Sequence, residues 1–299
     1  MKYIKLNNTV YSFTSNIKHD KAIRTSFNTL TEASFGFNME AWYQSGYWGD
    51  NYIAYSLLHE NKIISNVSVS VIEFIIDKEK KIGIQLGTVM TDKNHRKGGL
   101  NKFIMEQVLN EWKEKADFIY LYANDSVLDF YPKFNFEIVD EYQYSKPVKD
   151  NSDISSIKKI NIDNDNEKEF LKDILKNSIP ISKVSMRNNT GLIMFYCLWI
   201  KKNSIYYIDT LKTIVIADFE GDTLYLNDVF TKEHVSLNHI IKAISNKYVK
   251  NVVLGFTPLD KKGYNKKLLK EEGTTLFVLK DYVDYFKHKH WMFPVLSHA

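Results

Sequence analysis

The sequence predicts a mixed α+β protein with two domains, each built on a mixed, mostly antiparallel central sheet flanked by helices. Apolar residues alternate over residues 82–90, as they do in a strand, and then recur at helical spacing from Leu100 to Leu109. In the second half, three strand-like stretches within residues 204–230 precede a helix-like stretch at 236–248. The chain has 299 residues, 44% of them apolar, which is enough to bury a core in each of two domains.

The N-terminal elements can be placed by their periodicity. Residues 2–6 predict a short strand, and apolar residues at helical spacing predict a helix from about Asp20. Residues 52–76 predict two strands joined at His59–Lys62, and the alternation of valine and serine in the second strand gives the sheet two different faces. We expect this second strand to pair with the strand that ends at Met90.

A basic glycine turn, His95-Arg96-Lys97-Gly98-Gly99, lies between the strand at 82–90 and the helix that follows. The first N–H groups of a helix have no partner within the helix, and the helix dipole leaves partial positive charge there. Glycine allows close approach of the backbone, and the two cations add charge, so the turn suits a phosphate group. At this point a basic turn that only caps a surface helix is the alternative.

The next elements give this turn its context. Residues 117–124 predict another strand, and a short helix, a turn and a third strand follow. The segment resembles the GNAT (GCN5-related) N-acetyltransferase family, in which an Arg/Gln-x-x-Gly-x-Gly/Ala turn holds the pyrophosphate of acetyl-CoA. The turn here reads Arg96-Lys97-Gly98-Gly99-Leu100-Asn101, and Asn101 departs from the small residue at the last position. A later family element, an Asn, then a Tyr, then Gly-Phe, corresponds to Asn124, Tyr131 and Asn135-Phe136.

This resemblance implies an acetyltransferase that uses acetyl-CoA as its cosubstrate and transfers the acetyl group directly to an amine. The implied cofactor-binding residues are the strand end Val89, Met90 and Thr91, the turn residues Arg96, Lys97, Gly98, Gly99, Leu100 and Asn101, and Asn124. Tyr131 is the candidate general acid, because a phenol stays protonated at neutral pH and can donate a proton to the departing thiolate. No metal is expected.

An unusually aromatic segment over residues 36–58 precedes the second predicted strand and runs into it. In the family this region forms one wall of the acceptor pocket, so Trp42, Tyr47 and Trp48 are candidate substrate contacts, and we expect one or two of them to face substrate. Ordinary core packing is the alternative for most of these rings. Glu73 is a further candidate for binding the acceptor, or a solvated strand residue.

We predict a domain boundary in the polar segment Lys146–Asp153, which gives domains 1–147 and 148–299. In the second domain, residues 164–177 predict a helix, and residues 191–200 fit either a helix or a strand. Glu220-Gly221-Asp222 predicts a tight hairpin between two of the three strands. We expect strands at 250–257 and 274–280 to complete the second sheet.

An internal similarity suggests that the second domain is related to the first. Val89-Met90-Thr91 and the helix start at Leu100 correspond to Val229-Phe230-Thr231 and the helix start at Leu237, with three residues fewer between them. The missing residues are those of the basic glycine turn. We infer tandem GNAT-like domains of which the second is degenerate; an unrelated α+β substrate domain is the alternative.

The C-terminus is apolar where most chains end in frayed polar residues, so residues 291–296 are expected to pack inward. Some two-domain acetyltransferases of the Eis type place their terminal carboxylate in the active site as the general base. By this resemblance the α-carboxylate of Ala299 is the candidate base, and His298 is its competitor. A tail that closes the domain interface and takes no part in chemistry is the alternative.

Composition limits the partners and the compartment. The net charge of +4 arises from 40 basic and 36 acidic residues that are well mixed, so neither a nucleic acid nor a membrane partner is expected. The lone Cys197 excludes an internal disulfide, and with no recognisable signal peptide a cytoplasmic enzyme is expected. We predict an N-acetyltransferase acting on a primary amine of a small molecule or peptide. A catalytically weak acyl-CoA-binding sensor and a donor other than acetyl are the alternatives.

Overall fold

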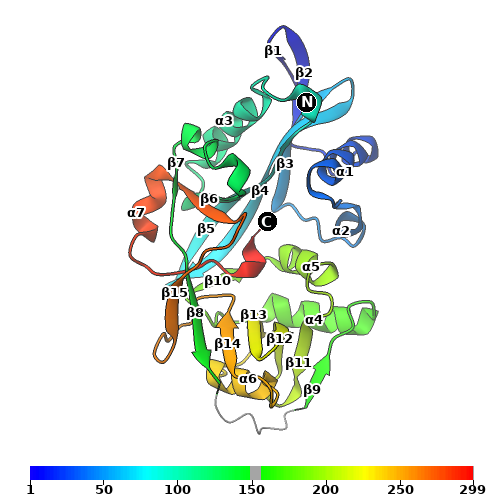
Figure 1. Cartoon of the computed structure of the whole chain (residues 1–299). Coiled ribbons are helices and arrows are strands. Elements are labelled where there is room, and N and C mark those ends of the chain that lie inside the picture. Colours follow the sequence, from blue (N-terminus) through cyan, green and yellow to red (C-terminus); the bar gives the residue numbers. More distant parts are fainter. Residues whose placement is uncertain (149–155, 299) are drawn as a thin grey trace.

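The computed structural model describes residues 1–148 and 156–298 and contains two sheets, the first lying above the second in the view of Figure 1. The strands of the first sheet are β1 (Lys2–Leu6), β2 (Thr9–Thr14), β3 (Tyr52–His59), β4 (Lys62–Ile76), β5 (Glu79–Thr91), β6 (Phe118–Ala123), β16 (Thr275–Leu279), β7 (Phe136–Ile138) and β10 (Val184–Arg187). They follow the order β1-β2-β3-β4-β5-β6-β16-β7, and β10 pairs with β4. Every pair in this sheet is antiparallel except β5–β6.

Helices cover both faces of the first sheet. α1 (Lys21–Phe35) and α2 (Glu40–Gln44) lie on one face and α3 (Leu100–Trp112) on the other (Figure 1). α1 begins as predicted, because the Asp20 carboxylate caps the N–H groups of Ala22 and Ile23. It ends at Gly36, whose φ of 78° is the left-handed conformation that glycine adopts freely.

The two faces of β4 differ as predicted. The valine face packs against α3, where Val67 and Val69 join Ile104 in one core cluster. The serine face carries hydroxyl groups instead, and Ser68 Oγ accepts a hydrogen bond from the Tyr52 hydroxyl at 2.8 Å. This polar face is the side of the sheet on which the cavity described below opens.

The second sheet contains β8 (Tyr142–Pro147), β9 (Ile157–Lys159), β11 (Ile205–Ile208), β12 (Thr213–Glu220), β13 (Thr223–Thr231), β14 (Asn251–Leu254) and β15 (Asn265–Leu268). Their order is β15-β8-β14-β13-β12-β11-β9, with β13–β14 as the parallel pair. The helices in the second half of the chain are α4 (Asp165–Asn177), α5 (Thr190–Leu198), α6 (Leu237–Ile244) and α7 (Val283–Phe286), and the last of them packs against the first sheet. The ambiguous stretch at 191–200 is therefore mostly helical. The mixed α+β class, with mostly antiparallel sheets and flanking helices, is confirmed.

One strand lies in a different sheet from the one predicted. The stretch at 274–280 does not complete the second sheet, because it forms β16 between β6 and β7 of the first sheet. Phe277 lies opposite Leu121 on one side and Ile138 on the other. Side chains on both faces of β16 are buried, so its sequence indicates a central strand without indicating which sheet it joins.

The two sheets exchange strands with respect to the chain. β8 belongs to the second sheet although it precedes residue 148, and β10 and β16 belong to the first sheet although they follow it. The predicted boundary segment extends into residues 149–155, which lie outside the described residues. The division into domains 1–147 and 148–299 stays a prediction.

The C-terminal stretch packs inward, as predicted. Met292, Phe293 and Leu296 are at most 3% exposed, and the Phe293 ring stacks on Tyr120 of β6 with 4.4 Å between ring centroids. This segment runs from α7 (Val283–Phe286), which lies beside the first sheet, to the space between the two sheets and ends near α5 (Figure 1). Within residues 1–148 and 156–298, no helix is long and apolar enough to cross a bilayer.

Candidate active site

The parallel pair β5–β6 separates at the point where the cavity opens. The two strands pair only from Gly83–Phe118 to Leu86–Leu121. Beyond that point β5 has a bulge, because Ser68 faces Gly87 and Asn66 faces Met90, which leaves two residues of β5 opposite one of β4.

Thr88 lies in this bulge with a φ of 47°, an uncommon conformation for a β-branched residue. Its hydroxyl oxygen lies 2.8 Å from the Tyr52 hydroxyl oxygen, and its carbonyl accepts a hydrogen bond from Asn66 Nδ2 at 2.9 Å. Residues held in strained backbone conformations cluster at functional sites. The bulge therefore marks this strand end as a candidate site.

A cavity of about 1230 Å³ lies beside this bulge, between the ends of β5 and β6, the loop around α2, and α5. Both halves of the chain line it. Its lining includes Leu86, Gly87, Thr88 and Val89 of β5, Tyr122 of β6, Asn124 and Tyr131 after β6, and Asn189, Gly191, Phe195 and Tyr196 from the second half. A cavity of this size exceeds the volume of about 300–1,000 Å³ that one small ligand usually occupies.

The basic glycine turn leads into α3, as the sequence predicts. Gly99 is the N-cap residue with a φ of 75°, and Lys97 also has a positive φ, of 63°. The first bond within the helix runs from the N–H of Phe103 to the carbonyl of Gly99, so the N–H groups of the first helical turn are free of helical partners. Arg96 Nε donates to the Thr91 carbonyl at 3.2 Å, which ties the turn to the end of β5.

Asn101, the departure from the family motif, is held by the neighbouring strand. Its Oδ1 accepts a hydrogen bond of 2.7 Å from the Ser65 hydroxyl of β4. Ser65 also contacts Thr91 and the carbonyl of Met90. The larger side chain is thus bonded to the sheet end through Ser65, and the turn keeps the glycine at position 99.

Tyr131 and Asn124 both line the cavity. Tyr131 is 5% exposed, and burial raises the pKa of its hydroxyl to about 12, so the oxygen carries its proton at neutral pH. Asn124 follows β6, and its Oδ1 accepts from the N–H of Ser126 at 3.0 Å. Of the predicted cofactor residues, Val89 and Asn124 thus line the cavity together with Tyr131, whereas Met90, Thr91 and the turn residues 96–101 are not among its lining residues.

The predicted acceptor residues are only partly brought together. Trp42 and Tyr47 line the cavity, whereas Trp48 lies behind Trp42 and donates its indole N–H to the Tyr52 carbonyl at 3.2 Å. Glu73 is not among the lining residues. Its carboxylate lies 2.5 Å from Lys80 Nζ, which makes it a paired strand residue.

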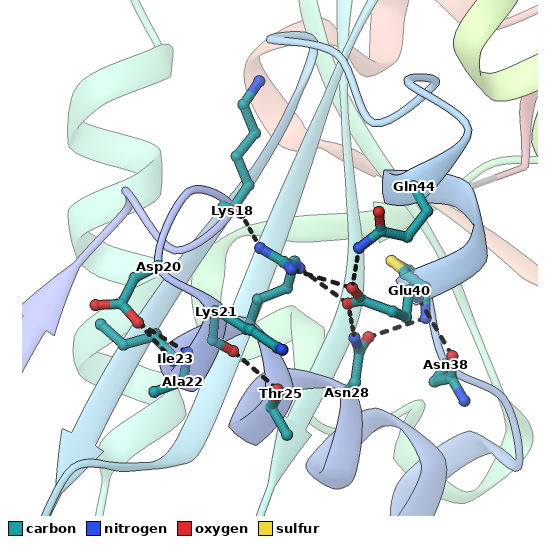
Figure 2. Close-up of polar contacts among 12 residues, drawn as sticks. Lys18, Asp20, Lys21, Ala22, Ile23, Thr25, Asn28, Asn38, Glu40 and Gln44 are labelled. Atoms are coloured by element: carbon teal, nitrogen blue, oxygen red, sulfur yellow. Dashed lines mark hydrogen bonds and ion pairs between the residues drawn. The ribbon is translucent and has the colours of Figure 1, made fainter.

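A buried polar network fixes α2 and with it Trp42. Figure 2 shows Glu40 of α2 pointing toward Asn28 of α1, with Gln44 on its other side. Arg24 donates to both oxygens of the Glu40 carboxylate, at 2.9 and 3.0 Å, and its guanidinium lies 3.7 Å from the centroid of the Tyr43 ring. These bonds raise the pKa of Arg24 and lower that of Glu40.

The C-terminal tail reaches the cavity. His298 is a lining residue, its ring stacks on Tyr122 at 3.8 Å, and its carbonyl accepts a hydrogen bond from the Tyr196 hydroxyl. Burial lowers the pKa of His298 to about 3, so the imidazole is neutral, and its Nε2 has no hydrogen-bond partner among the described residues. Ala299 lies outside the described residues.

Sequence reasoning missed a buried carboxyl group behind the cavity. Glu141 Oε1 accepts hydrogen bonds from the N–H of Phe293 at 2.8 Å and from the Tyr122 hydroxyl at 3.1 Å. Burial raises the pKa of Glu141 to about 7. A single acidic residue in a loop before β8 carries no sequence signal, because its partners come from β6 and from the distant tail.

The parallel strands β13 and β14 of the second sheet also separate, but there the C-terminal tail lies between them. β13 and β14 pair up to Leu226–Leu254, and the Val295 N–H then donates to the Gly255 carbonyl at 2.9 Å. A Cβ atom at Gly255 would lie 2.8 Å from the Val295 side chain, so the tail is in close contact there. Ser236 caps α6 where the first half has its basic turn.

Comparisons with known proteins agree with this geometry. A family model described as an acetyltransferase (GNAT) domain matches residues 19–139. No curated protein matches the sequence significantly.

Three similar solved structures each align with 91% of this chain. A probable N-acyltransferase from Enterococcus faecalis V583 is 15% identical, with 73% of its own chain covered and a TM-score of 0.57. Eis1 from Mycobacterium abscessus is 13% identical, with 74% covered and a TM-score of 0.57. A GCN5-related N-acetyltransferase from Kribbella flavida is 10% identical, with 72% covered and a TM-score of 0.56. At these identities the structures show a shared fold. The domain match identifies residues 19–139 as a GNAT acetyltransferase domain.

Proposed function

We propose that the protein transfers an acetyl group from acetyl-CoA directly to a primary amine of a small molecule or peptide. The observation that carries this proposal is the separation of β5 and β6 at a bulge, beside both the glycine turn of α3 and the large cavity. The pyrophosphate would bind the N–H groups after Gly99, with Arg96 and Lys97 adding charge. The pantetheine arm would lie along Val89–Thr91 and reach Asn124.

The reaction forms a C–N bond and breaks the thioester C–S bond. The neutral amine attacks the thioester carbonyl, whose oxygen can be polarised by main-chain N–H groups near Met90. The CoA thiolate leaves and takes a proton from Tyr131. Because burial holds the pKa of Tyr131 at about 12, the hydroxyl keeps its proton until the leaving group forms.

The amine proton needs an acceptor, and we propose the α-carboxylate of Ala299. His298, the residue that precedes it in the sequence, lines the cavity, which supports this proposal. The His298 imidazole is the competing base, but burial lowers its pKa to about 3, into the range of a carboxylate, so the histidine loses the advantage of a pKa near neutrality. Adding one glycine after Ala299 displaces the carboxylate and should lower kcat, with acetyl-CoA binding retained. Unchanged turnover would exclude the terminal carboxylate as base.

The first experiment is calorimetric titration of acetyl-CoA into the wild type and Gly99→Asp. The variant places bulk and negative charge at a residue with a φ of 75°, so we expect binding to be lost. Gly263→Asp is the matched control, because Gly263 has a φ of 79° and a Cβ atom added at either glycine would meet nothing within 4 Å. Binding that survives in Gly99→Asp would show that the phosphate site lies elsewhere.

Amine-dependent release of CoA then separates an enzyme from a sensor. We expect Tyr131→Phe to lower kcat by about 10²–10⁴-fold while leaving the Kd for acetyl-CoA unchanged. A protein that binds acetyl-CoA but acetylates no amine would be the acyl-CoA-binding sensor instead.

A further inference from the structure

The cavity has an aromatic wall, formed by Phe35, Phe37, Trp42, Phe195 and Trp199. The rings form a continuous series of contacts with centroid distances between 4.8 Å for Phe195–Trp199 and 6.1 Å for Phe35–Phe37. Phe195 joins the two halves, because it contacts Phe37 at 6.0 Å and Trp42 at 5.8 Å. The wall is therefore made jointly by the α1–α2 region and α5.

The outer part of this wall is exposed to solvent. Phe35 is 47% exposed, Phe37 40% and Trp199 39%, and the neighbouring lining residue Ile200 is 59% exposed. Large apolar side chains gathered at the mouth of a cavity are the kind of patch that marks a ligand-binding groove. Burying them against an apolar ligand would be favourable in proportion to the area removed from water.

The lining is poor in charge. Among the described lining residues, only Asp50 and Lys172 carry a formal charge at neutral pH. Asp50 is paired with Lys18 at 2.6 Å and its side chain is 98% exposed, while Lys172 is paired with Glu169 at 2.8 Å. A ligand with several ammonium groups would lose hydration here without finding carboxylates to replace it.

The opposite end of the cavity is polar. Thr88, Asn124 and Tyr131 line it beside the bulge, where the proposed acetyl transfer takes place. A bound acceptor would thus have its reactive nitrogen at this end and an apolar body along the aromatic wall. Partial desolvation by the wall would lower the pKa of a bound ammonium group and favour its neutral form.

We propose that the acceptor is an arylalkylamine, a monoamine whose aromatic body binds along the aromatic wall. This rests on the proposed function for the chemistry, but binding of the amine can be measured without turnover. The probes are tryptamine, which has one amine and an aromatic body, and spermidine, which has three amines and no ring.

Calorimetric titration of each amine into the full-length protein saturated with CoA measures this selectivity. We expect the Kd for tryptamine to be at least about tenfold lower than that for spermidine. Trp199→Ala should raise the tryptamine Kd by about tenfold, the usual size of one aromatic contact. Tyr248→Ala is the matched control, because Tyr248 is 66% exposed and does not line the cavity, and it should leave the Kd unchanged.

Equal or tighter binding of spermidine overturns the proposal, as does absence of tryptamine binding or an unchanged Kd in Trp199→Ala. Turnover with acetyl-CoA separates this failure from failure of the proposed function. If tryptamine binds selectively but no N-acetyltryptamine forms, the proposed function is wrong and the ligand class stands. If spermidine is the amine acetylated, the proposed function stands and the ligand class is wrong.

Discussion

We predict that the stability advantage of Glu141→Gln over the wild type increases as the pH rises. The buried carboxyl has its pKa raised from 4.5 to about 7, so the folded state favours the protonated form. This contribution to stability is fully present below pH 4.5 and is lost as the pH rises through 7. Glutamine does not titrate, and its amide oxygen can still accept from the Phe293 N–H and the Tyr122 hydroxyl.

The size of the effect follows from the two pKa values. The raised pKa of Glu141 lowers the unfolding free energy of the wild type by about 0.8 kcal/mol at pH 5 and by about 3.3 kcal/mol at pH 8, compared with low pH. The difference in unfolding free energy between Glu141→Gln and the wild type should therefore move in favour of the variant by about 2.5 kcal/mol over this range. The wild-type carboxyl and the glutamine amide can accept the same two hydrogen bonds. Other contributions of this side chain to the unfolding free energy should therefore be similar at both pH values.

Urea unfolding followed by tryptophan fluorescence at pH 5 and pH 8 measures this difference. Glu106→Gln is the matched control, since it makes the same chemical change on the exposed face of α3, where the Glu106 side chain is 50% exposed. A difference between Glu141→Gln and wild type that is the same at both pH values would refute the reasoning. It would mean that the Glu141 carboxyl does not titrate as a buried group.

Three further substitutions test contacts that support the cavity. Glu40→Ala leaves the Arg24 guanidinium, 5% exposed, without its carboxylate, and should cost about 2–3 kcal/mol in urea unfolding; a loss below 0.5 kcal/mol would contradict this. Gly191→Ala places a Cβ 2.5 Å from the Tyr47 carbonyl oxygen, so thermal unfolding should show a cost of about 1–3 kcal/mol; an unchanged Tm would mean that α5 shifts freely. Phe293→Ala removes a ring that is 3% exposed and stacked on Tyr120, and should cost about 3–5 kcal/mol; a smaller loss would show that the tail adds little to stability.

The second sheet resembles the first at the point where its parallel strands separate. Its parallel strands separate after Leu226 and Leu254, as β5 and β6 do after Leu86 and Leu121. In the second sheet the tail lies in this place, with the Val295 N–H bonded to Gly255, and no basic glycine turn precedes α6. The tail then continues to the cavity of the first half, where it places His298.

Local features of the first half were predictable from the sequence. The strand, glycine turn and helix around Gly99 depend on side-chain periodicity and on residues that are close in the chain. The same holds for the Asp20 cap of α1 and the valine face of β4. The sequence also indicated that the tail packs inward, because exposing its large apolar residues to water would be unfavourable.

Contacts between distant segments could be read only from the tertiary structure. Alternation of side chains shows that residues 275–279 form a strand but not that it pairs with β6, because pairing depends on which edges meet in space. The same reason explains why Trp42 but not Trp48 lines the cavity, and why Glu73 is paired away from it.

The sequence by itself determined that this chain has a basic glycine turn before a helix and that Tyr131 follows the next strand, because both depend on residues close together in the chain. Only the tertiary structure decided what surrounds them. It brings α5, the tail and the buried Glu141 to the ends of β5 and β6, since long-range packing sets which side chains share a cavity and how far their pKa values shift.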